Sequence, residues 1–385
     1  MEPTPAPGGA RRGGGSGAGP VAPALPPPTE FEETTVTLTD ADLSAVLAGS
    51  TVVVTGGGGL VGSRITARLR AAGARVLAVG KLDAYPAAVY AGLFGVHTTD
   101  PDTIVGDIAD GTLMDHVVRE ADYVIHAAAV ADVAACTRNP MAAIETNVTG
   151  TQVLLDAVRR CNARVRRFVF VSSAAVYGNG DPKRRDVQTW HEDQPLAPLS
   201  VYANTKAWGE AQTALVLGKA NVSHTSVRYF SVYGEPQTVK EGSHSWVVAW
   251  MAMRAKLGLP LHLNGGGRQV RDFVHVDDIA AATIRAMLAR SADRQTLNIG
   301  TGRATSIANV AHLIRNHYPD VEFQDRPLPE GDPLGGTAGT ARMTAALEWE
   351  PRITVAEGVA RYVAWLDNTP AALPDFLRRE AAEAA

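Results

Sequence analysis

Residues 51–62 read Thr-Val-Val-Val-Thr-Gly-Gly-Gly-Gly-Leu-Val-Gly, and this stretch decides the fold of the chain. The β-branched run at 51–55 predicts a short buried strand, and the pattern at 60–70 predicts a helix. Between them, Gly56, Gly59 and Gly62 allow a tight turn and a close approach of the backbone to a pyrophosphate. The helix that follows would aim its N-terminal amides at the negative charge. Strand, loop and helix together predict a dinucleotide site, with Leu60 and Val61 among its contacts.

The same alternation of short strands and longer helical patterns continues along the chain. We expect strands at about 51–55, 75–79, 103–105, 122–126, 166–171 and 223–228. Strands that alternate with helices indicate an α/β fold, a doubly wound parallel sheet of the Rossmann type.

After Gly234 the pattern becomes less regular, with helices expected near 244–256, 278–290 and 306–317 and an extended segment at 261–263. We interpret this part as a smaller C-terminal substrate lobe whose segments interleave with the sheet domain. The expected organisation is a disordered tail at 1–30, a dinucleotide-binding domain at 31–234 with contributions from about 268–303, a mainly substrate-binding lobe at 235–367 and a C-terminal tail at 368–385.

Composition narrows the class of partner. The chain has 385 residues, a net charge of -4 and only two cysteines. A slightly acidic chain has no electrostatic footprint for nucleic acid. Two cysteines exclude a disulfide framework and a cysteine-rich metal site, so we expect no metal. No apolar stretch is long enough for a membrane span and the N-terminus lacks a signal peptide, which predicts a cytoplasmic protein.

The end of the second strand departs from the usual dinucleotide pattern. An acidic residue there normally binds the adenosine ribose, but this chain has Gly80-Lys81. Lys81 would favour a ribose 2'-phosphate, Asp83 would reach a 2'-hydroxyl, and a third interpretation makes Lys81 an ordinary loop residue. After the third strand, Asp107 and Ile108 would cap the adenine pocket, or Asp107 is an ordinary acid of a turn.

A second cluster predicts catalysis. Ser173 follows the fifth strand, and Tyr202 precedes Lys206 by four residues, so that the two share one face of a helix. A lysine ammonium beside a tyrosine ring stabilises the phenolate, which makes Tyr202 a general base when an oxidised nicotinamide lies nearby. Ser173 would bind the same substrate oxygen.

At this point the chain resembles an extended short-chain dehydrogenase/reductase of the nucleotide-sugar epimerase/dehydratase family, over about Ser50 to Asp367. The resemblance also rests on several further stretches, which are His126-Ala-Ala-Ala129, Asn147-Val-Thr-Gly150, Arg228-Tyr-Phe-Ser-Val-Tyr-Gly234, Arg271-Asp-Phe-Val-His-Val-Asp277, Asn298-Ile-Gly-Thr-Gly302 and Leu347-Glu-Trp349.

The resemblance implies roles that the residues alone do not. It implies that Ala128 and Asn147 line an NAD cofactor, with NADP as the alternative that Lys81 leaves open, and that Tyr202 and Lys206 also contact it. It implies a nucleotide-diphosphate sugar as substrate, with its diphosphate held by Arg271, and a homodimer formed through the two long helices of the sheet domain. The planar fork of an arginine suits two phosphate oxygens.

The residues after Ser173 discriminate between members of the family. Dehydratases that resemble this chain carry Asp and Glu there, whereas this chain has Ala174 and Ala175, and an alanine moves no proton. Without those carboxylates only hydride transfer remains, in which C4 is oxidised by the bound cofactor and the hydride returns to the other face. This reaction predicts a 4-epimerase. The alternatives are a ketoreductase that consumes reduced cofactor, an atypical dehydratase or decarboxylase, and a non-catalytic sugar-nucleotide-binding protein.

The substrate segments also differ from the family pattern. Ser231 stands where the family often has an asparagine that helps to hold a phosphate, and basic residues are missing soon after Asp332. Arg326 or Arg342 would replace the lost charge, or the segment is a flexible loop. Trp246 and Trp250 would stack on the nucleotide base or pack in the core.

Overall fold

The computed structural model describes residues 40–161, 163–179, 186–242, 246–328 and 335–384, and the predicted N-terminal tail at 1–30 lies outside them. A seven-stranded sheet in the order β3-β2-β1-β4-β5-β7-β12 forms its centre, and every pair of neighbouring strands in it is parallel. The doubly wound Rossmann fold predicted from the sequence is therefore confirmed. The strands of this sheet are β1 (Thr51–Thr55), β2 (Arg75–Gly80), β3 (Thr103–Val105), β4 (Tyr123–His126), β5 (Arg167–Ser173), β7 (His224–Tyr229) and β12 (Thr296–Ile299).

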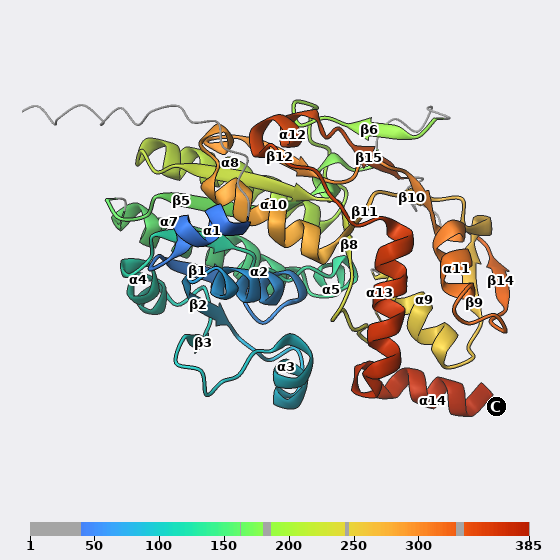
Figure 1. The fold of residues 1–385 in the computed structure, drawn as a ribbon. Coiled ribbons are helices and arrows are strands. Elements are labelled where there is room, and N and C mark those ends of the chain that lie inside the picture. Colours follow the sequence, from blue (N-terminus) through green and yellow to red (C-terminus); the bar gives the residue numbers. More distant parts are fainter. Residues whose placement is uncertain (1–39, 162, 180–185, 243–245, 329–334, 385) are drawn as a thin grey trace, which may run out of the picture. The chain divides into compact units, whose positions relative to one another are not determined.

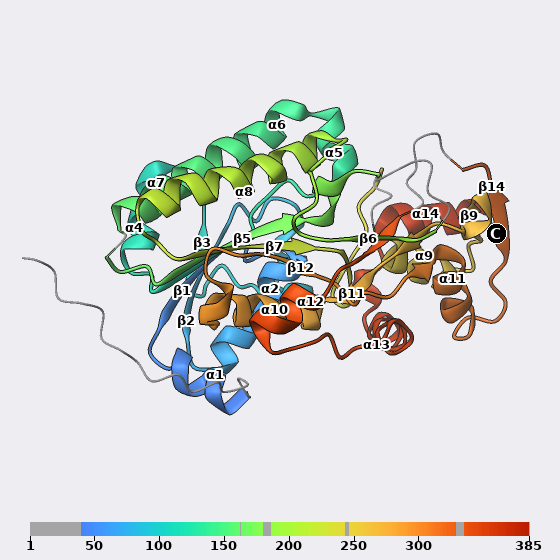
Figure 2. The ribbon, with the colours of Figure 1, turned by 90° about the horizontal axis from the view of Figure 1, so that it is seen from above.

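Helices cover both faces of the sheet (Figures 1 and 2). On β1, Val52 and Val54 pack with the helices of one face, and Val53 packs with those of the other. This alternation is the period-2 pattern of a strand that is buried on both sides. One face carries α1 (Asp40–Leu47), α2 (Leu60–Ala71) and α10 (Val276–Leu288), and the other carries α4 (Gly111–Arg119), α7 (Thr151–Arg160) and α8 (Val201–Lys219).

Shorter elements connect the strands near the carboxyl edge of the sheet. A π-helical segment, η1 (Glu145–Gly150), joins α6 to α7 in one nearly continuous helix. Such π segments are frequent at functional sites. The other short elements are α3 (Ala87–Phe94), α5 (Val133–Arg138), α6 (Pro140–Ile144) and the 3-10 helices η2 (Ala174–Tyr177) and η4 (Arg290–Ala292).

A second hydrophobic core lies mainly in the part of the chain beyond Gly234, where α9 (Val247–Lys256), α11 (Ile307–Arg315), α13 (Val355–Asn368) and α14 (Asp375–Ala384) pack together. The chain returns from this region to the sheet through α10 and β12, whose buried side chains belong to the first core. The strand β11 (Phe273–His275) contributes to both cores, with Phe273 in the second and Val274 in the first. The remaining elements are β6 (Gln188–Trp190), β8 (Ser231–Tyr233), α9 (Val247–Lys256), β9 (Leu261–Asn264), η3 (Gly265–Gly267), β10 (Val270–Arg271), β11 (Phe273–His275), β13 (Thr305–Ser306), α11 (Ile307–Arg315), β14 (Phe323–Arg326), β15 (Gly336–Ala338), α12 (Ala341–Leu347), α13 (Val355–Asn368), η5 (Pro370–Ala372) and α14 (Asp375–Ala384).

We expected the C-terminal segment 368–385 to be a tail, but its described residues form η5 (Pro370–Ala372) and α14 (Asp375–Ala384). Leu377 is fully buried in the second core, and Phe376 stacks on Trp250. Arg254, itself buried, forms a salt bridge with Glu380. The segment is ordered because its apolar stripe finds a partner surface on α9, which a short charged sequence does not reveal. None of the helices in the described part of the chain is both long and apolar enough to cross a membrane.

Candidate active site

The glycine loop between β1 and α2 lies against the segment that follows β4. Gly56 has a φ of +73°, and a Cβ atom there would lie 2.7 Å from the backbone nitrogen of Ala128. A Cβ atom at Gly62 would lie 2.1 Å from the carbonyl oxygen of Gly56. Only glycine fits at these two positions, because backbone occupies the space where a side chain would stand.

The start of α2 is open to an anion. Its N-cap residue is Gly59, which is exposed and provides no side-chain cap for the first amides of the helix. Leu60 and Val61, in the first turn, are half-buried. Uncapped amides at a helix N-terminus bind phosphate, so this loop fits a dinucleotide pyrophosphate.

Lys81 and Asp107 meet at the carboxyl ends of β2 and β3. The Lys81 Nζ lies 2.8 Å from the Asp107 Oδ2, and both side chains are partly exposed. The hydrogen bond to Asp107 raises the pKa of Lys81. Asp107 also accepts a hydrogen bond from the amide of Ala109 at 3.0 Å. Lys81 is therefore held by a carboxylate rather than projecting as an unpaired cation. Ile108 is buried against Gly150, where a Cβ atom would lie 2.6 Å from its Cγ1.

Ser173, Tyr202 and Lys206 come from β5 and α8. Ser173 ends β5 and caps η2, accepting a hydrogen bond from the amide of Ala175 at 3.2 Å. Ser200 caps α8, which places Tyr202 in its first turn and Lys206 one turn later. The Lys206 Nζ lies 6.0 Å from the centre of the Tyr202 ring and donates a hydrogen bond to the carbonyl of Val171 at 2.8 Å. The structure thus brings the three predicted catalytic residues together.

Burial controls the proton affinities of this group. It raises the pKa of Tyr202 to about 12, although a hydrogen bond with Ser173 opposes the shift. It lowers the pKa of Lys206 to about 8, and the negative charge of Glu210 opposes that shift. In the protein alone Tyr202 is therefore a neutral phenol at pH 7, ready to donate a proton. To accept one, it needs further positive charge beside it.

The sequence motifs did not single out a buried ion pair one turn beyond Lys206. Arg228 donates two hydrogen bonds to the carboxylate of Glu210, with distances of 2.9 and 2.7 Å. Ser172, next to Ser173, also donates to Glu210. Arg228 further donates to the hydroxyl of Tyr177 at 2.8 Å. This network joins α8 to β5 and β7 next to Ser173 and Lys206. The i,i+4 spacing of Lys206 and Glu210 was the available signal.

A chain of hydrogen bonds between threonine and histidine side chains begins at Thr55, immediately before the glycine loop. His126, at the end of β4, is 2.7 Å from the Thr55 Oγ1 and 2.8 Å from the Thr151 Oγ1. The Thr151 hydroxyl donates to the carbonyl of Asn147 at 2.6 Å. The Asn147 side chain is buried and bonds to both backbone groups of Val130. Asn147 is thus held next to the segment of Ala128, while its amide is already engaged within the protein.

The other two predicted substrate residues, Ser231 and Arg271, lie on the short strands β8 and β10. The amide of Ser231 donates to the carbonyl of Asp272 at 2.9 Å, immediately after Arg271. Ser173 pairs with Tyr229 across β5 and β7, so that Ser231 follows the strand next to Ser173. The Arg271 guanidinium donates to the carbonyl of Val270 at 2.8 Å.

The two arginines considered as replacements for the lost basic charge differ in their surroundings. Arg342 forms an ion pair with Asp193 and lies 3.9 Å from Glu192. Arg326 donates to Gln324 at 3.2 Å on the surface. Arg342 is therefore neutralised by carboxylates within the protein. The segment 329–334 that would carry the usual basic residues lies outside the described residues.

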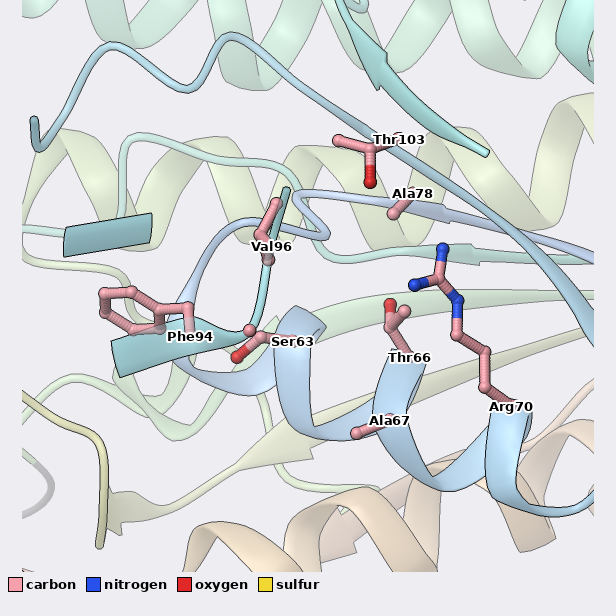
Figure 3. A pocket seen from close by; sticks show the side chains of 9 residues that line it. Ser63, Thr66, Ala67, Arg70, Ala78, Phe94, Val96 and Thr103 are labelled. Atoms are coloured by element: carbon pink, nitrogen blue, oxygen red, sulfur yellow. The ribbon is translucent and has the colours of Figure 1, made fainter. Parts of the chain in front are cut away.

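A cavity of about 100 Å³ lies between α2 and the strands β2 and β3 (Figure 3). Thr66 and Arg70 border it from the helix and Thr103 from the strand. The Thr66 hydroxyl is buried and has no hydrogen-bond partner. A cavity of this size with a few polar groups on its wall can hold a few water molecules, and none of the predicted site residues lines it.

A doubly wound sheet with a glycine loop after β1 and a Ser, Tyr and Lys group at its carboxyl edge defines an enzyme of the short-chain dehydrogenase/reductase class. The model of the NAD-dependent epimerase/dehydratase family matches residues 52–300. The chain belongs to this family and is one of its enzymes.

Relatives with different reactions are similar to this chain at nearly the same level. A putative UDP-glucose 4-epimerase of Methanocaldococcus jannaschii is 30% identical over 82% of this chain and 98% of its own length. A dTDP-glucose 4,6-dehydratase of Streptomyces antibioticus is 31% identical over 87% of this chain and 97% of its own length. Overall similarity therefore does not separate epimerase from dehydratase.

The fold matches solved structures of the same family. A UDP-glucose 4-epimerase of Thermus thermophilus, solved in complex with NAD, is 27% identical with a TM-score of 0.69, covering 82% of this chain and 98% of that one. The predicted family and fold are confirmed by these matches.

Proposed function

We propose that this chain is a nucleotide-sugar 4-epimerase that acts by reversible hydride transfer at C4 of a nucleotide-diphosphate hexose, with bound NAD. The observation that carries the proposal is the Ser173, Tyr202 and Lys206 group next to Ala174 and Ala175. The proton-moving parts of hydride transfer are present, and the carboxylates that an elimination requires are absent from these two positions.

Each residue of the group has a role in the proposal. When bound, the nicotinamide would accept the hydride from C4, return it to the other face, and bring a positive charge next to the Tyr202 phenol. Tyr202 takes the proton of the C4 hydroxyl in one direction and returns it in the other. Lys206 stabilises the phenolate, and Ser173 binds the same sugar oxygen. The open amides of α2 and the backbone of Gly56 hold the pyrophosphate.

Ala174 and Ala175 separate this proposal from the dehydratase alternative. Both begin η2, directly after Ser173, and the Ala175 amide donates to the Ser173 hydroxyl. A carboxylate at either position would be needed to protonate the leaving hydroxyl or to remove the C5 proton. The methyl groups present there do neither.

The ketoreductase alternative rests on the missing acid at Gly80. Its argument was that Lys81 would bind the 2'-phosphate of NADPH. Because Lys81 is paired with Asp107, that cation is neutralised and the argument loses its strength. We therefore favour NAD and an epimerase that recycles it.

The substrate class follows from the relatives, several of which are named for UDP-sugars. We propose a UDP-hexose, with Arg271 at its diphosphate and Ser231 nearby, and with residues 235–367 as the main substrate lobe. A homodimer and a cytoplasmic location stay predictions from the sequence, and the molar mass in solution would test the first of them.

The test is an assay of the purified protein without added reductant. With UDP-glucose, UDP-N-acetylglucosamine or UDP-glucuronic acid, we expect conversion of at least one into its C4 epimer, with no loss of water or carbon dioxide. Tyr202→Phe should lower turnover by about 10²- to 10⁴-fold while NAD still binds. A product richer by two hydrogens, formed only with added NADH or NADPH, would instead identify a reductase.

Tyr229→Phe is the matched control for Tyr202→Phe. Tyr229 is a buried tyrosine on the neighbouring strand β7, and its hydroxyl bonds to Thr283 at 2.6 Å rather than to Ser173. Its hydroxyl bonds to Thr283 and to none of Ser173, Tyr202 and Lys206, so we expect this variant to turn over at nearly the wild-type rate.

A further inference from the structure

We propose that His126 is a positioning residue, which as the neutral tautomer protonated on Nε2 links the glycine loop to the helix that carries Tyr202. The inference rests on the proposed function for the importance of Tyr202, but the hydrogen-bonded chain itself follows from the fold. His126 touches neither the sugar nor the catalytic group. It acts through the threonines on either side of it.

The direction of each hydrogen bond in the chain follows from its donors and acceptors. The Thr151 hydroxyl has one proton and donates it to the carbonyl of Asn147, which can only accept. Towards His126, Thr151 must then accept, so the Nε2 of His126 carries a proton. In a neutral imidazole the Nδ1 is then an acceptor, and the Thr55 hydroxyl donates to it. Thr55 in turn accepts from the amide of Ala128 at 3.3 Å.

The chain continues on the far side of Asn147 to the catalytic helix. The Asn147 amide donates to the Thr205 hydroxyl at 3.1 Å, and Thr205 donates to the carbonyl of Tyr202 at 2.8 Å. Each O–H and N–H proton in this run has one acceptor, because the two protons of the Asn147 amide go separately to Thr205 and to the carbonyl of Val130. The run begins at Thr55, immediately before Gly56, and ends on the backbone of Tyr202.

The hydrogen-bonded chain holds four separate segments of the protein. They are the end of β1, the residues after β4, the π-helical segment η1 and the first turn of α8. In the proposed reaction, the first three face the dinucleotide and the fourth carries the proton donor and acceptor. The hydrogen-bonded chain then fixes the distance between the cofactor and Tyr202. Small displacements of reacting groups have large effects on rate, so the rate depends on these hydrogen bonds.

Histidine suits this position because it is buried and must stay uncharged. His126 is 1% exposed, and burial together with the nearby Lys206 ammonium lowers its pKa to about 3. A protonated imidazole would donate at both nitrogens, and Thr55 would lose the acceptor of its hydroxyl proton. The neutral ring instead donates to Thr151 on α7 and accepts from Thr55 on β1. Because the imidazole is a rigid ring, it fixes the distance between these two hydroxyls.

The kinetic test compares three variants. Thr151→Val removes the hydroxyl that joins His126 to Asn147 and keeps the shape of the side chain. We expect kcat to fall at least tenfold, with KM for the sugar nucleotide within twofold of wild type, since the hydrogen-bonded chain includes none of Ser173, Ser231 and Arg271. Thr151→Ser keeps the hydroxyl and should restore most of kcat.

Thr283→Val is the matched control. Thr283 on α10 is fully buried, donates to the carbonyl of Ile279 four residues earlier and bonds to the hydroxyl of Tyr229, so it repeats the bonding pattern of Thr151 outside the chain. Its loss should leave kcat and KM within twofold of wild type. If wild type is active and Thr151→Val behaves like Thr283→Val, the positioning role of His126 is refuted. If wild type itself shows no epimerisation, the proposed function fails instead.

A spectroscopic test does not depend on activity or on the folding of any variant. In protein labelled with ¹⁵N-histidine, the ring signals of His126 are assigned by their disappearance in His126→Gln or, if that variant does not fold, by their couplings to neighbouring nuclei in wild type. We expect a protonated Nε2 and an unprotonated Nδ1, unchanged from pH 8 to pH 5. A proton on Nδ1, or an imidazolium in this range, would overturn the assignment of the chain.

Discussion

The Lys81 ammonium lies 2.8 Å from the Asp107 carboxylate, and the two residues follow the adjacent parallel strands β2 and β3. The pair occupies the edge where a Rossmann fold binds the adenosine ribose, although the usual acid is replaced by Gly80. A 2'-phosphate entering here would meet Asp107 as well as Lys81, and the two charges would largely cancel. The pair therefore favours NAD over NADP.

Replacing either member of the pair should change the choice of cofactor in opposite directions. Asp107→Asn frees the Lys81 charge and should raise the affinity for NADP relative to NAD by about three- to tenfold, given the weakness of half-exposed charges. Lys81→Ala leaves the Asp107 carboxylate without its lysine partner and should lower the affinity for NADP relative to NAD. Titration of each variant with NAD and NADP measures both ratios. Gly80→Asp is a useful third variant, since a Cβ atom there would lie 3.8 Å from the Leu82 Cδ2 and 4.0 Å from the Gly58 nitrogen, which are ordinary contacts. If all variants showed the same ratio of NADP affinity to NAD affinity as wild type, the Lys81–Asp107 pair would have no role in the choice of cofactor.

Lys206 should cost the protein stability. Its pKa of about 8 lies below the 10.5 of an exposed lysine, so below pH 8 the folded state carries a buried charge that the unfolded state would carry in water. As pH rises from 8 to 10.5, the folded state releases this proton first and its relative stability increases. Lys206→Met should therefore be more stable than wild type at pH 7, by about 1–3 kcal/mol, and inactive. Urea denaturation at pH 7 and pH 9.5 tests this, with a smaller gap expected at the higher pH. A destabilised variant at pH 7 would contradict it.

His126 should make the protein sensitive to acid. Its folded pKa of about 3 lies below its unfolded value of 6.5, so between these values only the unfolded state binds the proton. Stability is then fully present above pH 6.5 and is lost as pH falls. From pH 7 to pH 4.5, wild type should lose on the order of 2 kcal/mol more than His126→Gln does. Parallel pH dependences of the free energy of unfolding for the two proteins would argue against a neutral buried imidazole.

The Glu210–Arg228 pair should be essential to folding in a way that surface pairs are not. Both side chains are less than a tenth exposed, and Glu210→Gln removes the carboxylate charge that pairs with the guanidinium. We expect a loss of about 3–5 kcal/mol in the free energy of unfolding. Glu357→Gln is the control, because the Glu357–Arg361 pair on α13 is an exposed i,i+4 pair worth at most about 0.5 kcal/mol. Thermal or urea unfolding of both variants measures the difference, and similar losses would show that burial of the pair is unimportant.

Much of the sheet could be predicted because its signals are local. The six strands expected from 51–55 to 223–228 all occur, with ends shifted by at most two residues. Each is an apolar run beside a helical pattern, and β1, β4, β5 and β7 are buried on both faces, so sequence pattern and tertiary environment agree. At the edge of the sheet, β3 is partly exposed, with Val105 open to solvent. The seventh strand, β12, is short and lies far along the chain from its partner β7, which is why only a general contribution from 268–303 was expected.

What the sequence by itself determined is the Rossmann fold, the glycine loop and the spacing of Tyr202 and Lys206, because strand, turn and helix each depend on neighbours a few residues apart. Only the tertiary structure decided that Lys81 is paired with Asp107, that α14 is packed rather than a tail, and that His126 joins Thr55 to Thr151. These contacts link residues about 25 to 130 positions apart, and the proton affinity of a buried group depends on what surrounds it in space.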